Sequence, residues 1–353
     1  MGTNLRKNPE SEFIITPKTS ISSQFLEKSG TEKVPRTLSI SWPVFFVLLL
    51  TVTLCSSEVS ALEYSGMISI EAIDMTGENV YQQSFESGRS KLKWPIDVKT
   101  LGIELGLTGK DLFDVEFLAA AEPWVSDSHP MKDYDYINES AYPGRQSHDG
   151  VDIFSESKVE SKAFVIDGKS HLFPVRTRFI SAGLTAGYRY EEYDYRASDT
   201  RQTGYGPWQD QTSKVSGPTS LYTIEYEIFS LGLSLRSDIG DTLVLTLDAC
   251  ALPFVHVKDE DNHIRRTRIS KSTTSGSGYQ TSFSGLYKIS RNWFISSGFT
   301  LSSIETSGHS DQFWYGDDPA TPYFNDTGEM LKGIDTEINQ KCYRFNLGAS
   351  RHF

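Results

Sequence analysis

The stretch Ile180-Ser-Ala-Gly-Leu-Thr-Ala-Gly-Tyr-Arg-Tyr190 places an apolar, small or aromatic side chain at every second position. Successive side chains of a β-strand point to opposite faces, so this spacing predicts a strand with one apolar face. The same alternation recurs along most of the chain, in residues 101–107, 113–121, 243–251, 279–289, 293–301 and 343–353. We therefore predict an all-β protein.

A soluble β-sandwich shows the same alternation, so the pattern alone leaves two architectures open. Three features favour a transmembrane barrel. The candidate strands have about 10–20 residues rather than the usual five or six, Tyr, Trp and Phe crowd their ends, and the last alternating strand finishes on Phe353. A closed barrel also pairs every backbone group in lipid. We expect a transmembrane antiparallel β-barrel of about ten strands, with an even number preferred.

The segments between the predicted strands differ in length. Short turns at residues 237–241 and 290–292 alternate with long polar segments at roughly residues 122–153, 196–218, 256–276 and 305–337. Outer-membrane barrels have short periplasmic turns and long extracellular loops. Any chemistry is therefore expected on the extracellular loops.

The N-terminal region has the features of a targeting signal. Residues 42–54 are mostly apolar, follow Lys33 and Arg36, and precede Val59-Ser-Ala61, which fits a cleavage site for small residues. This apolar run is shorter than the roughly 20 residues that a membrane-spanning helix needs, which favours a secretory signal over an N-terminal anchor. We predict an N-terminal extension plus signal peptide at residues 1–61 and the barrel at residues 62–353.

Composition excludes several classes of protein. The net charge of −12 argues against a nucleic-acid binder, whose footprint would be basic. Three cysteines are too few for a disulfide framework, and no Cys/His cluster indicates a metal site. Beyond residue 61 only Cys250 and Cys342 remain. They could pair in an oxidising compartment, but the sequence does not show that their strands are neighbours.

Two acidic and histidine-containing motifs are the candidates for chemistry. In Asp133-Tyr-Asp135 the two carboxylates share one face of an extended segment, about 7 Å apart, where like charges raise the pKa of one member. In Asp261-Asn-His263 the carboxylate could orient the imidazole as a base for water. The competing interpretation of both motifs is a solvated polar loop. The sequence has neither a Gly-x-Ser-x-Gly elbow nor a His-Glu-x-x-His motif, so water is the nucleophile we expect.

The second motif raises a problem of register. Asp261 and His263 share parity with the residues from Leu243 to Ala251, which are expected to face lipid. A regular strand would therefore point the motif away from the lumen. We predict a β-bulge at Pro253-Phe254, which would turn the motif inward.

With these motifs the sequence resembles the omptins, outer-membrane endopeptidases of Gram-negative bacteria. The resemblance runs from about Ile68 to Phe353. Besides Asp133-Tyr-Asp135 and Asp259-Glu-Asp-Asn-His263, shorter segments carry it in the same order: Ile68-Ser-Ile70, Gly77-Glu-Asn-Val-Tyr81, Ser87-Gly-Arg89, Leu92-Lys-Trp94, Ala119-Ala-Ala-Glu-Pro-Trp124, Ala186-Gly-Tyr188 and Leu231-Gly-Leu233.

The resemblance implies a role for each matching residue. Asp133 and Asp135 look like the family's carboxylate couple, and Asp261 and His263 like the facing dyad that activates a water. Glu78 and Asp259 match the acidic residues of the specificity pocket, which would favour peptide substrates with Arg or Lys at the cleavage site. No metal or organic cofactor is implied. The implied protein is an outer-membrane endopeptidase whose active site faces the extracellular side. The sequence does not give its oligomeric state, and we expect a monomer.

One departure from the family concerns lipid. Omptins generally need lipopolysaccharide, bound by basic side chains on the outside of the barrel, as an activating lipid. At the matching positions this chain has Glu192 and Glu225, although the aromatic Tyr188 is kept. Either the lipid partner binds differently or the lipid requirement has changed. The alternative to a protease is a catalytically silent outer-membrane barrel, acting as a porin or a surface adhesin.

Overall fold

A computed structural model describes residues 64–85, 88–109, 112–137, 150–209, 212–319, 321 and 323–353. The predicted signal peptide and N-terminal extension, residues 1–61, lie outside the described residues. The division of the chain at residue 61 therefore stays a prediction.

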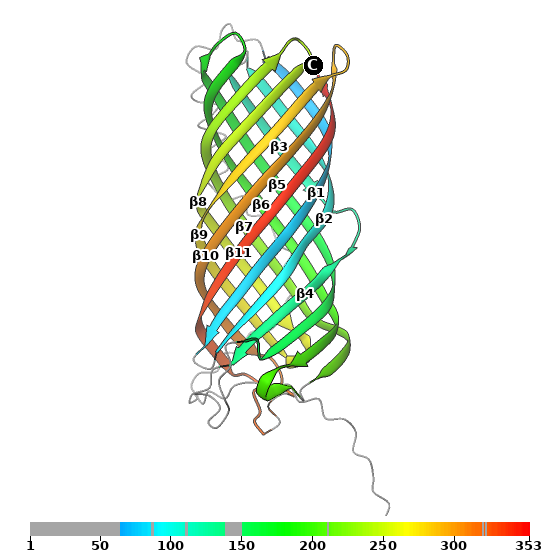
Figure 1. The fold of residues 1–353 in the computed structure, drawn as a ribbon, viewed down its shortest axis with the longest axis vertical. Helices are drawn as coiled ribbons and strands as arrows, with labels where there is room; N and C mark the ends of the chain where they lie inside the picture. The colour runs from blue at the N-terminus through cyan, green and yellow to red at the C-terminus, as the bar shows by residue number, and fades with distance from the viewer. Residues whose placement is uncertain are drawn as a thin grey trace, which may run out of the picture.

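The described residues form one closed antiparallel barrel (Figure 1). β1 pairs with β2 on one side and with β11 on the other, which closes the ring. β3 and β4 both lie between β2 and β5 and act as two parts of one interrupted strand, so the ring has ten positions. This confirms the predicted antiparallel barrel with an even strand number. The strands are β1 (Tyr64–Phe85), β2 (Gly88–Gly109), β3 (Phe113–Ala121), β4 (Ser126–Ile137), β5 (Ile153–Arg176), β6 (Ile180–Gly204), β7 (Ser213–Ile239), β8 (Leu243–His263), β9 (Arg268–Lys288), β10 (Trp293–Trp314) and β11 (Met330–His352).

Most of the segments predicted to be long loops are strands instead. β6 continues to Gly204 before β7 begins at Ser213, and β8 and β9 are separated only by residues 264–267. The segment predicted as a loop at 122–153 contains β4, while its residues 138–149 lie outside the described residues. The physical reason is that these strand ends are polar on both faces, which a strand tolerates in water. Polarity was therefore a poor guide to where the strands end.

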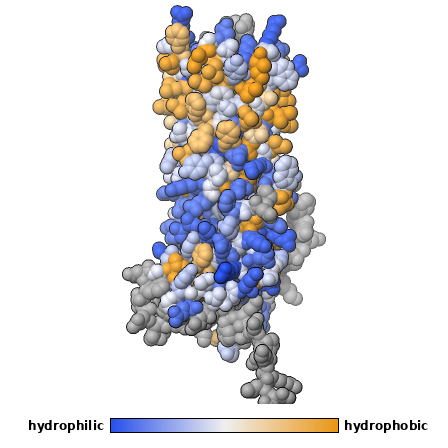
Figure 2. Space-filling model, turned by 45° about the vertical axis from the view of Figure 1, so that its right-hand side comes forward, coloured by the Kyte–Doolittle hydropathy of each residue, from blue (hydrophilic) through white to orange (hydrophobic). Residues whose placement is uncertain are grey.

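The outer face of the barrel is divided into an apolar and a polar half (Figure 2). Exposed hydrophobic side chains gather near the end that carries the short turns, and they include Leu101, Ile103, Leu105, Leu231, Leu233, Leu235, Phe283, Tyr287, Phe345 and Leu347. The opposite half is dominated by polar side chains. Such a band of outward apolar residues is what a barrel presents to lipid. In the described part of the chain, no helix is long and apolar enough to cross a membrane.

The lumen is filled by inward-pointing side chains. At the level of the apolar band, buried ion pairs join Arg344 to Asp167 at 2.7 Å and Arg189 to Glu191 at 2.8 Å. Nearer the polar end, Trp94 stacks on Tyr222 with ring centroids 4.7 Å apart. A barrel of this size has an interior that side chains can fill.

The two described cysteines do not form a disulfide. Cys250 on β8 and Cys342 on β11 are both buried free thiols. The strands that carry them are separated by β9 and β10, so the two residues are not cross-strand neighbours.

The predicted bulge is present in β8. Between Leu252 and Val255 this strand holds one residue more than β9, and its register with β7 shifts at the same place. Pro253 and Phe254 are both exposed, whereas Val255, Val257, Asp259 and Asp261 are buried inside. This confirms the predicted change of parity, which turns the second motif into the lumen.

Candidate active site

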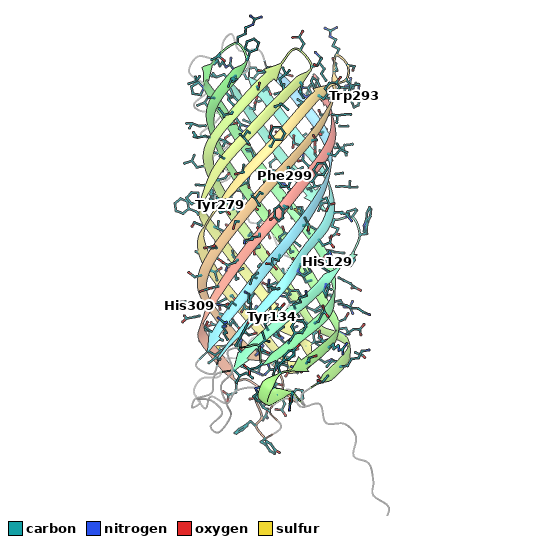
Figure 3. The ribbon with its side chains drawn as sticks, viewed as in Figure 1. His129, Tyr134, Tyr279, Trp293, Phe299 and His309 are labelled. Atoms are coloured by element: carbon teal, nitrogen blue, oxygen red, sulfur yellow. The ribbon has the colours of Figure 1, made fainter. Side chains whose placement is uncertain are left out.

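The two motifs lie on strands at the polar end of the barrel. Asp133 and Asp135 belong to β4, opposite Leu92 and Ser90 of β2, and Asp261 and His263 belong to β8, opposite Ser270 and Arg268 of β9. In Figure 3, Tyr134 marks this part of β4, far along the barrel from Trp293 beside a short turn. The sequence placed both motifs on loops. They sit instead on paired backbone, which fixes the direction of each side chain.

Asp133 and Asp135 form a coupled pair of carboxylates. Burial and the neighbouring Asp135 raise the pKa of Asp133 well above its usual value, while the Oγ of Ser90 donates a hydrogen bond to it at 3.2 Å and opposes that rise. Burial also raises the pKa of Asp135. Two carboxyls that share a confined site retain a proton to a higher pH than an isolated one.

Asp261 and His263 form the second pair. One carboxylate oxygen of Asp261 lies 3.1 Å from Nε2 of His263, and the other accepts a hydrogen bond from Ser220. Burial alone would raise the pKa of Asp261, but His263 and these hydrogen bonds outweigh it and hold the pKa below its usual value. Burial lowers the pKa of His263, although Asp261 opposes this. An ionised carboxylate therefore faces a neutral imidazole near neutral pH.

The structure brings the two pairs together across the lumen. The charge of Asp261 is close enough to raise the pKa of Asp133, and Arg268 acts on both Asp133 and His263. The side chain of His263 is 25% exposed while that of Asp261 is 5% exposed, so the imidazole is the member of this pair that meets solvent. The arrangement can place a water molecule between a neutral base and a carboxyl pair.

Two arginines were missed by the reasoning from sequence. Arg268 faces His263 across the β8–β9 pair, and burial together with Arg266 lowers its pKa to about 10. Arg266 in turn is paired with Asp318 at 3.0 Å. No signal in the sequence indicated Arg268, because residues 256–276 were predicted to form a loop. Only the structure shows the tight connection at residues 264–267 that brings Arg268 opposite His263. The proximity of Arg268 makes the site less acidic than its four motif residues alone suggest.

Asp259 lies deeper in the lumen than His263. It accepts hydrogen bonds from the hydroxyl of Tyr222 at 3.4 Å and from the backbone N–H of Ser272 at 3.1 Å. Burial raises the pKa of Asp259 to about 7. With Trp94 stacked on Tyr222, the carboxyl stands beside an aromatic cluster. In its ionised form, this carboxyl can bind a cationic side chain.

Glu78 is not brought together with Asp259. Its side chain is 42% exposed and is paired with Lys93 at 3.1 Å. Its neighbours in the chain, Asn79 and Tyr81, are buried in the lumen. The alternation of β1 therefore points Glu78 outward, away from the pocket in which the sequence placed it.

No metal site accompanies these groups. Within the described ranges, no set of three or more His, Cys, Asp or Glu side chains is arranged to hold a metal ion.

The two glutamates at the positions of the family's basic lipid-binding residues are neighbours. Glu192 and Glu225 lie directly opposite each other on β6 and β7, and the hydroxyl of Tyr190 donates a hydrogen bond to Glu192 at 2.7 Å.

A closed ten-stranded barrel with an apolar outer band and a polar site at one end defines the class of outer-membrane β-barrels. The sequence profile of the Omptin family matches residues 62–326. The chain belongs to the omptin family and is an omptin-family outer-membrane protease.

One solved structure with a TM-score above 0.5 shares the fold. The outer membrane protease OmpT from Escherichia coli superimposes with a TM-score of 0.67 at 13% identity, covering 83% of this chain and 99% of that chain. OprG from Pseudomonas aeruginosa gives a TM-score of 0.31 at 8% identity, covering 83% and 96%, and Ail of Yersinia pestis gives 0.25 at 8%, covering 82% and 99%. No curated protein matches the chain by sequence.

Proposed function

We propose that the chain is an endopeptidase that cleaves peptide bonds next to basic residues with a water activated by Asp261 and His263 opposite the Asp133–Asp135 pair. The observation that carries this proposal is the meeting of the two pairs across the lumen with opposite protonation tendencies. The neutral imidazole is ready to accept a proton, and the carboxyl pair is disposed to keep one. These are the complementary groups that acid–base hydrolysis requires.

The mechanism follows from which nitrogen of His263 is engaged. Nε2 faces the carboxylate of Asp261, so Nε2 carries the hydrogen and Nδ1 is left to take a proton from the water. The resulting hydroxide attacks the scissile carbonyl carbon, and the negative charge of Asp261 stabilises the imidazolium that forms. The protonated member of the Asp133–Asp135 pair donates a hydrogen bond to the carbonyl oxygen. The imidazolium then returns the proton to the leaving amine as the C–N bond breaks.

Asp259 is the group we assign to the basic side chain of the substrate. Its carboxyl lies on the same strand and the same face as Asp261, two residues further from the strand end. A guanidinium can bind a carboxylate through two parallel hydrogen bonds and also stack on aromatic rings, which favours Arg over Lys. Glu78 contributes no contact to this pocket, because its side chain is on the outer face.

The site is proposed to face the outside of the cell. It lies at the polar end of the barrel, away from the short turns that outer-membrane barrels place in the periplasm. Glu192 and Glu225 argue against activation by a lipid bound to a basic outer cluster, because two facing carboxylates repel lipid phosphates. We propose that the enzyme acts as a monomer on peptides or proteins and needs neither metal nor organic cofactor.

The test is cleavage of a peptide that contains Arg-Arg by refolded protein, with and without lipopolysaccharide. We expect Asp133→Ala and His263→Ala to abolish cleavage while the barrel remains folded. The matched control is His309→Ala, because His309 lies 3.5 Å from Asp335 in a second His–Asp pair that points outward from the barrel (Figure 3). If the refolded wild type is inert under both conditions, the proposed cleavage fails and the alternative of a catalytically silent barrel, a porin or a surface adhesin, takes its place.

A further inference from the structure

A hollow lies on the outer wall of the barrel, away from the proposed active site. It has a volume of about 280 Å³ and is formed over β1, β2, β10 and β11, which lie side by side (Figure 1). Asp74, Asp97 and Lys99 contribute its charged wall, and Phe299, Tyr343 and Phe345 its aromatic wall. All of these residues are on the lipid-facing side of their strands, so the hollow opens outward.

The hollow lies at the edge of the apolar band. Along β2 the outward side chains change from Leu105, Ile103 and Leu101 to Lys99 and Asp97. Along β11 the exposed Leu347 and Phe345 are followed by Tyr343 and then Lys341. Figure 3 places Phe299 within the upper, apolar half of the wall and His129 nearer the polar end. This is the level at which a lipid changes from acyl chain to polar head.

The charges in the hollow are left open to a ligand. Asp74 and Lys99 are direct cross-strand partners, a position at which opposite charges ordinarily pair. Among the described residues, neither forms a hydrogen bond or ion pair through its side chain with another residue. Asp97 is held by His129 at 2.9 Å, which fixes one carboxylate oxygen and leaves the other for the hollow. Two carboxylates and one ammonium thus surround the space with a net negative charge.

We propose that this hollow binds a zwitterionic phospholipid with a primary ammonium head, of the phosphatidylethanolamine type. The lipid ammonium donates hydrogen bonds to Asp74 and Asp97, and Lys99 takes the phosphate. The acyl chains run along the exposed Phe299, Tyr343 and Phe345 towards the apolar band. This head has one partner for each sign of charge in the hollow: its ammonium for the two carboxylates and its phosphate for Lys99. An anionic phospholipid can pair its phosphate with Lys99 but has no ammonium of its own to offer the two carboxylates. A trimethylammonium head has no N–H to donate.

The experiment is a lipid titration of refolded protein in detergent, followed by native mass spectrometry. The probes are phosphatidylethanolamine, phosphatidylcholine and phosphatidylglycerol with identical acyl chains. We expect the ethanolamine lipid to bind about tenfold more tightly than the other two, the effect of one charge-assisted hydrogen-bonded contact. Soluble phosphoethanolamine should compete only weakly, because it lacks the chains that contact the aromatic wall.

Variants test the two carboxylates and the lysine of the hollow separately. Asp74→Asn together with Asp97→Asn should remove the preference for the ethanolamine lipid, and Lys99→Gln should weaken the ethanolamine and choline lipids equally. Asp194→Asn and Lys258→Gln, on the outer faces of β6 and β8, are matched controls that should change neither. Circular dichroism establishes that each barrel is folded, and Asp74→Asn alone replaces the double variant if that one does not fold. Equal binding of the three lipids, or a preference that survives the loss of both carboxylates, overturns the proposal.

Discussion

Nε2 of His263 lies 3.1 Å from one carboxylate oxygen of Asp261, while Ser220 donates a hydrogen bond to the other oxygen of the same carboxylate. The carboxylate is therefore fixed from two sides, and the imidazole is held in a single orientation. A buried anion in this position serves the imidazole in two ways. It selects the tautomer with the hydrogen on Nε2, and it stabilises the positive ring that forms when Nδ1 accepts a proton.

The first prediction concerns Asp261→Asn. The amide keeps the size of the side chain but carries no negative charge, so the imidazolium loses its partner. We expect kcat to fall by about a thousandfold, within the range for a positioned acid–base group, with little change in KM. Steady-state cleavage of the Arg-Arg peptide measures both constants. Asp335→Asn, which alters the exposed pair with His309, should leave them unchanged. A kcat close to wild type for Asp261→Asn would contradict the assigned role.

The second prediction concerns Arg268→Gln and the dependence of cleavage on pH. The positive charge of Arg268 lowers the pKa of His263 and of Asp133, so its removal raises both. Cleavage needs a neutral His263, and the acidic limb of kcat/KM should therefore move to higher pH. The alkaline limb reports the proton retained by the Asp133–Asp135 pair and should move in the same direction.

The control for this change is Arg265→Gln. Arg265 is exposed and donates a hydrogen bond to the backbone carbonyl of Ser216 at 2.6 Å, without acting on the motif residues. Its removal should leave both limbs where they are in the wild type. The proposed placement of Arg268 fails if its own variant gives a pH profile that coincides with that of Arg265→Gln.

The third prediction concerns Asp259 as the partner of the substrate cation. Burial raises the pKa of Asp259 to about 7 in the free protein. Its carboxyl is mostly protonated below that pH and mostly ionised above it, so KM for an Arg peptide should fall as pH rises through about 7. A peptide with citrulline in place of Arg has a similar shape but no charge, and its KM should not change over this range.

Asp259→Asn provides the complementary measurement. The variant should lose the preference for Arg over citrulline, by about ten- to a hundredfold in kcat/KM, because the charge-assisted contact is gone. The rate with the citrulline peptide should be retained, which distinguishes a specificity residue from a residue needed for folding. An unchanged Arg preference would assign the pocket to another group.

Much of this architecture could be predicted from the order of residues. Alternation such as that of Ile180–Tyr190 predicted the strands, because a strand with one apolar face must repeat with a period of two. The length of the strands and the aromatic residues at their ends then favoured a barrel over a sandwich. The conflict of parity between Ala251 and Asp259 required a bulge between them, and Pro253 indicated its position. A single extra residue is the smallest change that reverses the facing of a strand.

Other features depend on partners that are distant in sequence. Ser220 and Ser90 reach the motif residues only because β7 lies beside β8 and β2 beside β4. Glu78 shows a different limit of prediction from sequence. A motif match gives the residue type at a position, but not whether its side chain faces the lumen or the outside of the barrel. Counting by twos from the outward Ile68 and Ile70 would have placed Glu78 outside as well, as the structure does.

The fourth prediction tests the role of the bulge. β7 and β9 alternate regularly past this point, and β8 holds the one extra residue between them. Deleting Phe254, which is 72% exposed, should therefore restore a regular strand with Leu252, Val255, Asp259 and Asp261 still pointing inward. We expect the deleted protein to refold and to cleave at a rate close to wild type.

Deleting Lys258 is the matched control, because it also shortens β8 by one residue but within its regular part. To keep Asp261 and His263 inward, the strand would have to turn Val255 and Val257, which are 2% and 0% exposed, out of the lumen and bring Phe254 and His256 in. Losing two buried valines and burying an imidazole is costly, so this deletion should abolish cleavage. Peptide cleavage and heat-dependent gel mobility follow activity and folding for both proteins. A folded but inactive Phe254 deletion would show that the bulge shapes the site itself, beyond correcting the parity of the strand.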